Sequence, residues 1–114
     1  MTTPAVTEQQ FERAADETLH AVERALGDLD GLEIDLQLGV LTLEFSDGVK
    51  YVVNSHRAAR QIWAAAERSA WHFDYQTKKA LWIAGKDGAE LWATLEAVLG
   101  RKLGRPIALP RAAG

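Results

Sequence analysis

The sequence predicts an α+β fold, a two-layer α/β sandwich in which two helices pack on one face of an antiparallel sheet of about six strands, in the order helix, strands, helix. Three observations predict this class. Apolar residues near both ends recur at helical spacing, the residues between them alternate apolar and polar in short runs, and turn-forming residues separate those runs. Because two amphipathic helices cover only one face of such a sheet, we expect the other face to meet solvent.

The two helices are expected near the two ends of the chain. The first should run from Thr7 to about residue 26, because the Thr7 hydroxyl can accept from an early backbone N–H and Glu8 suits the positive helix end. The second is expected over residues 89–99, with Gly100 as its natural stop. The tail beyond it carries two prolines and should lie extended over the domain, with two apolar residues tucked in, Ile107 and Leu109.

The strands are expected between these helices. Gly39 permits a tight reversal, and residues 46–48 read Ser-Asp-Gly, which is typical of a hairpin turn. The segment 58–68 is rich in Ala and Arg and resembles a helix on propensity alone, yet its place in the series favours a strand. The six expected strands span residues 32–38, 40–45, 49–54, 58–68, 71–75 and 80–84.

Length and composition favour one domain over residues 1–114. The chain is 47% hydrophobic, which is enough for one compact core. It has no cysteine, which excludes disulfides, thiolate metal ligands and a cysteine nucleophile. Residues 1–10 have neither a basic head nor an apolar run of signal-peptide length, and no later run approaches a membrane span. We therefore expect a cytoplasmic protein that does not bind or span a membrane.

Charge is unevenly distributed along the chain. Residues 1–38 carry nine acidic residues and two arginines, whereas the net charge of the whole chain is only −3. An acidic third joined to a basic remainder predicts that one surface attracts cations and another attracts acidic partners. The alternative is a solvated helix face whose acidity serves only solubility.

Four side chains of the first helix share one flank, because they are spaced by four, four and three residues: Glu12, Asp16, His20 and Glu23. A cation would offset the repulsion between these carboxylates, and His20 would either add a nitrogen ligand or remain solvated. Four more acids follow in the link and the first strand: Asp28, Asp30, Glu33 and Asp35. Carboxylate oxygens are hard ligands that suit Fe²⁺, Fe³⁺, Mn²⁺ or Ca²⁺, so the eight residues are candidate metal ligands of an open, weak site.

The solvent face of the sheet offers a second candidate site. Trp63 should project from neighbouring strands together with Gln61, Asn54 and Arg60. An exposed tryptophan ringed by polar groups is typical of an interface anchor. The alternative is that Trp63 belongs to the core, as expected for Trp82 and Trp92.

Catalysis and nucleic-acid binding are both disfavoured. The sequence contains no glycine-rich phosphate loop, no G-x-S-x-G elbow and no H-E-x-x-H pair. The three histidines are far apart in sequence, and the paired carboxylates occupy exposed positions where a raised pKa for general-acid work is not expected. The acidic third would repel phosphate. We therefore expect a protein that is not an enzyme and does not bind nucleic acid.

Six segments of the sequence, in matching order and spacing, resemble the bacterial frataxin (CyaY) family, and together they extend over nearly the whole chain. The resemblance implies the same sandwich, weak binding of iron (Fe²⁺ or Fe³⁺) on an acidic ridge, and association with a cysteine desulfurase and an iron–sulfur scaffold protein. By position it places the seven acids of the candidate metal set on that ridge, and Asn54, Gln61 and Trp63 on the family's partner surface. The six segments are residues 11–30, 39–45, 47–54, 61–65, 72–74 and 81–95.

The leading hypothesis is therefore an iron-dependent regulator or iron donor that acts on the desulfurase complex. It is expected to be a monomer by default, with an iron-dependent oligomer as the alternative state. Two other functions stay open: a ferroxidase or iron-storage protein, and a metal-independent protein-interaction module. Arg24, Gly27 and Gln37 occupy ridge positions where the family usually carries more acid, which predicts a lower iron capacity.

Overall fold

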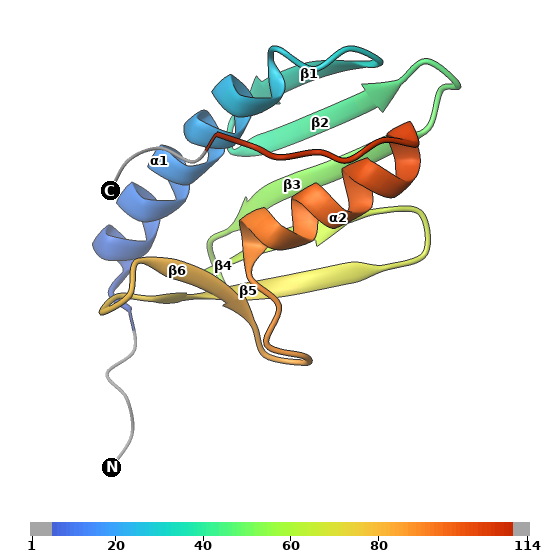
Figure 1. Ribbon diagram of the computed structural model, residues 1–114. Coiled ribbons are helices and arrows are strands. Elements are labelled where there is room, and N and C mark those ends of the chain that lie inside the picture. Colours follow the sequence, from blue (N-terminus) through green and yellow to red (C-terminus); the bar gives the residue numbers. More distant parts are fainter. Residues whose placement is uncertain (1–5, 111–114) are drawn as a thin grey trace.

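The computed structural model describes residues 6–110 as one antiparallel sheet with two helices on it (Figure 1). Helix α1 spans Glu8–Leu26 and helix α2 spans Leu91–Leu103. The six strands follow one another across the sheet in chain order, which confirms the expected fold class. Their bounds are β1 Leu32–Gln37, β2 Val40–Phe45, β3 Lys50–His56, β4 Gln61–Ala65, β5 Ala70–Gln76 and β6 Leu81–Ala84.

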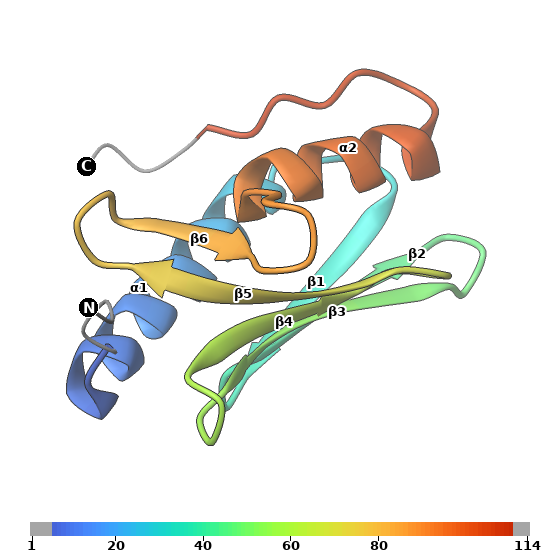
Figure 2. The same cartoon turned by 90° about the horizontal axis from the view of Figure 1, so that it is seen from below.

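The core lies between the helices and one face of the sheet. Alternation along each strand points one set of side chains toward the helices, where they are buried, including Leu43, Val53, Ile62 and Phe73. The tail after α2 runs back along the outer side of this helix (Figures 1 and 2), and Leu109 is buried there. The other set of strand side chains forms an open face that neither helix covers.

Helix α1 begins where the sequence predicts. Thr7 is its N-cap, and its hydroxyl accepts from the Gln10 backbone N–H at 3.1 Å while the Gln10 side chain accepts from the Thr7 N–H at 2.9 Å. In its middle, Thr18 accepts a 2.9 Å hydrogen bond from the indole N–H of Trp82 on β6. This bond attaches α1 to β6, which is the edge strand on the opposite side of the sheet from β1.

Helix α2 extends one turn beyond the predicted end. Gly100 lies inside the helix, and Gly104, with φ 71°, is the C-cap. A Cβ at Gly100 would lie 3.2 Å from the Arg105 carbonyl oxygen, so glycine at this position lets the tail pass close to the helix. The prediction that Gly100 ends α2 was wrong because that glycine provides room for packing, not a left-handed cap.

The predicted strand over residues 58–68 is also shorter in the structure. Residues 57–60 form a turn, residues 61–65 form β4, and residues 66–69 connect to β5. The Ala and Arg residues that blurred the pattern lie mostly in these turns. Within residues 6–110, no helix is long and apolar enough to cross a membrane.

Candidate functional site

Trp63 lies at the centre of the open face of the sheet. In the strand register it is directly opposite Asn54 of β3 on one side and His72 of β5 on the other. Gln61 lies two residues before it on the same strand and therefore on the same face. The structure thus brings together the three predicted partner-binding residues, and Trp63 is on this face and not in the core.

Hydrogen bonds fix the orientation of the Trp63 indole. Its N–H donates to Gln61 Oε1 at 2.8 Å, and the Gln61 amide nitrogen donates to Asp74 Oδ1 at 3.0 Å. The Asn54 amide nitrogen donates to the carbonyl oxygen of the next residue, Ser55, at 3.2 Å. Gln61 therefore acts as the positioning residue for Trp63, and Asn54 provides an amide beside the ring.

Two histidines enclose the Trp63 ring. His56 stacks on it with ring centroids 3.7 Å apart and planes at 11°, and His72 stacks with centroids 4.2 Å apart and planes at 14°. The result is a stack of three rings across β3, β4 and β5, which we call the Trp63 platform. Sequence reasoning missed this cluster because it treated the histidines by their distance along the chain. The alternation of residues 71–75 could have indicated this cluster, since it places His72 and Asp74 on the solvent face.

Arg60 does not belong to this platform, although it was expected to project with Trp63. It lies in the β3–β4 turn with φ 53°, and its guanidinium donates to the Val6 carbonyl oxygen at 2.7 Å, just before α1. Its neighbour Arg57 bonds the first turns of α1 through Glu8 and Glu12, with Arg57 Nε 2.6 Å from Glu12 Oε1. Both arginines therefore join the turn to the helix.

The four candidate ligands on α1 do share one flank, where Glu23 is half-buried and the other three are exposed, but some already have partners. Glu12 is bonded to Arg57, and this hydrogen bond raises the pKa of Arg57. His20 Nδ1 lies 2.9 Å from the Asp16 carbonyl oxygen and 3.4 Å from Asp16 Oδ1. Glu23 has no ion pair within residues 6–110. The helix therefore offers single and paired carboxylates, not a convergent set.

The other four candidates lie around the edge of the sheet next to α1. Asp28 and Asp30 are exposed in the link between α1 and β1. Glu33 and Asp35 project from β1 onto the open face, because Leu32, Ile34 and Leu36 take the positions that pack on the core. Glu33 is opposite Glu44 of β2, so two carboxylates face each other there.

In the part of the chain that the structure describes, no three His, Asp or Glu side chains are grouped so as to hold a metal ion. The eight candidates form an acidic strip that starts on α1, crosses the link and passes to the outer side of β1. We call these eight residues the acidic strip. Each of its carboxylates can offer a metal one or two oxygens, and water would complete the coordination.

A hollow of about 510 Å³ lies between α1 and the β1–β2 turn. Its walls include the strip residues Glu12, Asp16 and His20, and also Leu38 and Gly39 of the turn. Apolar side chains from Phe11, Ala15, Leu19 and Leu36 line it as well. This part of the strip is therefore acidic at its rim and apolar beneath.

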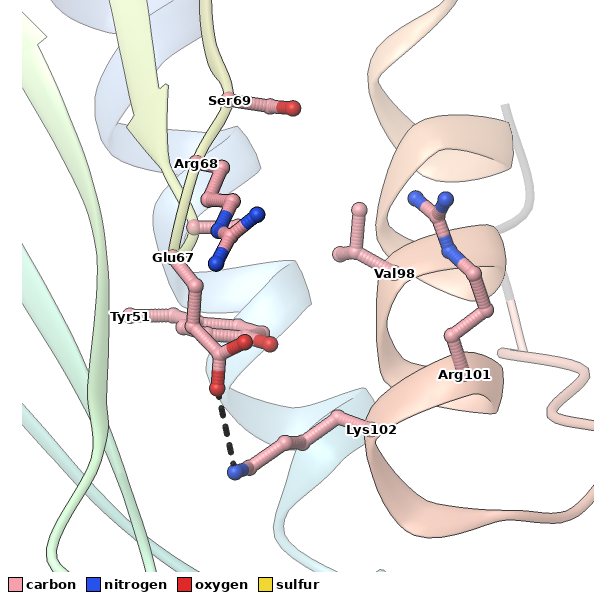
Figure 3. A pocket seen from close by; sticks show the side chains of 8 residues that line it. Tyr51, Glu67, Arg68, Ser69, Val98, Arg101 and Lys102 are labelled. Carbon is pink, nitrogen blue, oxygen red and sulfur yellow. Dashed lines mark hydrogen bonds and ion pairs between the residues drawn. The ribbon is translucent and has the colours of Figure 1, made fainter.

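A hollow of mixed charge lies beside the C-terminal part of α2, close to the link, where Arg105 Nη2 donates to the Asp30 carbonyl oxygen at 2.9 Å. This hollow of about 350 Å³ between the β4–β5 connection and α2 is lined by Arg68, Arg101 and Lys102 (Figure 3). Lys102 Nζ lies 2.5 Å from Asp47 Oδ2 and 3.2 Å from Glu67 Oε1. The hydrogen bond between Lys102 and Asp47 raises the pKa of Lys102 and lowers the pKa of Asp47.

Comparison with known proteins places this geometry in a family. The model of the frataxin-like domain matches residues 4–105. The iron-sulfur cluster assembly protein CyaY of Thioalkalivibrio sulfidiphilus (strain HL-EbGR7) is 36% identical over 102 residues, which cover 87% of this chain and 95% of that protein. CyaY of Janthinobacterium sp. (strain Marseille) is 36% identical over 110 residues, covering 91% and 96%.

Solved structures show the same fold. Frataxin from Psychromonas ingrahamii superposes with a TM-score of 0.80 at 24% identity and covers 89% of this chain and 95% of that one. Trimeric frataxin from the yeast Saccharomyces cerevisiae has a TM-score of 0.70 at 24% identity, covering 91% and 97%. This chain belongs to the frataxin family, as its residues predicted.

Proposed function

We propose that this chain is an accessory protein of iron–sulfur cluster assembly that binds the cysteine desulfurase and its scaffold protein in the cytoplasm. Its relatives from Thioalkalivibrio and Janthinobacterium are named as iron-sulfur cluster assembly proteins, which supports the same pathway for this chain. In this proposal the protein carries out no chemistry of its own. It acts as a monomer that brings two surfaces, the acidic strip and the Trp63 platform, to its partners.

The observation that carries the proposal is the exposure of the acidic strip. Asp28, Asp30 and Glu33 are exposed and make no ion pair within residues 6–110, so their charge is available to a partner. A positively charged protein surface would be attracted to this strip over several ångströms, and the attraction would weaken with added salt. The same carboxylates would hold Fe²⁺ or Fe³⁺ weakly, because water must complete the coordination of each ion.

The Trp63 platform supports a second contact with the same assembly. It presents a preorganised stack of aromatic side chains at low entropic cost, because the Gln61 hydrogen bond and the two stacked histidines already hold the Trp63 ring. Such preorganised aromatic residues are typical of the residues that contribute most to binding energy at interfaces.

A binding experiment with the desulfurase tests this proposal. Four strip acids are changed together to their amides, Asp28→Asn, Asp30→Asn, Glu33→Gln and Asp35→Asn, and binding is measured by pull-down and titration. The expected result is at least a tenfold loss of affinity, with a weaker salt dependence. Glu17→Gln is the control, since Glu17 lies on a different flank of α1 and pairs with Arg13 at 3.5 Å. Undiminished binding by the fourfold variant would refute the role of the strip.

A further inference from the structure

The β1–β2 turn displays apolar side chains where a turn normally displays polar ones. Among residues 6–110, two large apolar side chains are exposed, Leu38 at 102% and Val40 at 41%. They lie on either side of Gly39: Leu38 belongs to the two-residue connection, and Val40 is the first residue of β2, opposite Gln37. Leu38 therefore has the exposure of a residue in an unfolded chain, although the fold around it is compact.

The backbone of Leu38 is unfavourable for a leucine. Its φ is 51° and that of Gly39 is 77°, the combination that tight two-residue hairpins of type I′ require. Asn-Gly is the sequence that suits this turn best, because asparagine tolerates positive φ and leucine does not. Arg60 and Ala80 also have positive φ, but both end four-residue turns and neither exposes a large apolar side chain.

Leu38 therefore does not stabilise the folded state, because its side chain is not buried and its backbone conformation is unfavourable for leucine. A residue that is strained and exposed in this way is retained for another contact more readily than for stability. The glycine that follows is hard to replace, because its φ of 77° strains any other residue and a Cβ there would lie 2.6 Å from Ser55 Oγ, which would have to move. The geometry of the turn is thus fixed, and the direction in which Leu38 projects is fixed with it.

The surroundings of Leu38 define the chemistry of what it can contact. It borders the hollow between α1 and the turn, whose rim carries Glu12 and Asp16. The one arginine at this rim, Arg57, is already bonded to Glu8 and Glu12. An approaching surface therefore meets one apolar projection next to Asp16, whose carboxylate has no lysine or arginine partner within residues 6–110.

We propose that Leu38 is an apolar anchor that inserts into an apolar recess flanked by lysine or arginine side chains on the desulfurase. This inference rests on the proposed function, because it assigns a contact within that complex. Basic side chains around the recess complement Asp16 and its neighbours, and they orient the encounter before the leucine is buried. Burial of the exposed leucine in such a recess removes its apolar surface from water, which favours binding.

The test is a substitution that helps the fold and harms the contact. Leu38→Asn suits the positive φ of the turn, so its thermal midpoint of unfolding should equal or exceed that of the wild type. Its affinity for the desulfurase, measured by titration calorimetry, should fall at least tenfold. Leu38→Met keeps an apolar side chain of similar size and should bind within threefold of the wild type. Both variants are compared at one protein concentration and one ionic strength.

The outcomes separate the anchor from the proposed function. If the wild type binds and Leu38→Asn binds equally well, the anchor is overturned while the proposed function stands. If the wild type does not bind the desulfurase at all, the proposed function fails and the anchor fails with it. If Leu38→Asn abolishes self-association of this chain but leaves desulfurase binding intact, Leu38 belongs to a contact between copies, which also overturns the inference.

Discussion

The hydrogen bond between Thr18 and Trp82 provides a sharp test of how α1 is held on the sheet. The Trp82 side chain is 3% exposed, and its indole N–H donates to Thr18 Oγ1 at 2.9 Å. Thr18→Val removes the acceptor while keeping the shape of the side chain. Valine and threonine have similar helix propensities, so the substitution isolates the hydrogen bond.

The expected cost follows from the burial of the indole. A buried donor that loses its partner destabilises a protein by about 1–3 kcal/mol. For a domain of this size, a loss of 1 kcal/mol lowers the thermal midpoint by about 4 °C. Thr18→Val should therefore lower the midpoint by roughly 4–12 °C, whereas Thr18→Ser keeps the hydroxyl and should cost less than about 1 kcal/mol.

The free energy of unfolding is measured by urea denaturation of the wild type and both variants. The reasoning requires that valine destabilise the protein more than serine, with unchanged m-values. If Thr18→Val lies within about 0.5 kcal/mol of the wild type, the indole N–H does not depend on Thr18, and the assigned attachment of α1 is refuted.

Two further predictions concern the Lys102–Asp47 pair and the Trp63 platform. The Lys102 hydrogen bond lowers the Asp47 pKa, so the stabilisation by Asp47 is present above the ordinary carboxyl pKa of 3.8 and is lost as pH falls through the folded-state value. Asp47→Asn should thus flatten the acid limb of stability against pH, and an unchanged limb would contradict the pairing. His72→Ala removes one ring stacked on Trp63 and should cost about 0.5–1.5 kcal/mol. The Trp63 indole N–H should then exchange faster with solvent by NMR, and unchanged exchange would show that His72 does not shield the ring.

The sequence predicted most of the fold because local patterns and global packing agree. The helical apolar spacing of α1 and the alternation of β1 are both produced by one buried face, so each could be read without the structure. The end of α2 could not be read in this way. Gly100 and Gly104 are both plausible caps in sequence, and only the path of the tail over Gly100 decides between them.

The candidate site was partly predictable for a similar reason. Gln61 and Trp63 share a face through the alternation of β4, and the register of three strands brings Asn54 beside them. The stacked histidines depend on pairing between strands, which single-strand patterns do not specify. The Arg57–Glu12 pair joins residues 45 positions apart, so no local pattern could indicate that this strip residue is bonded.

The central claim is that the acidic strip on α1, the link and β1 attracts iron. An NMR titration with Fe²⁺ under anaerobic conditions tests it most directly, because the paramagnetic ion broadens amide signals near its binding site. The proposal predicts the strongest broadening at residues 12–23 and 28–35, reversed by a chelator, with the signals of residues 85–88, in the loop after β6 on the far side of the sheet from β1 (Figure 1), unaffected. Equal broadening throughout the domain, or broadening centred on His56 and His72, would contradict it.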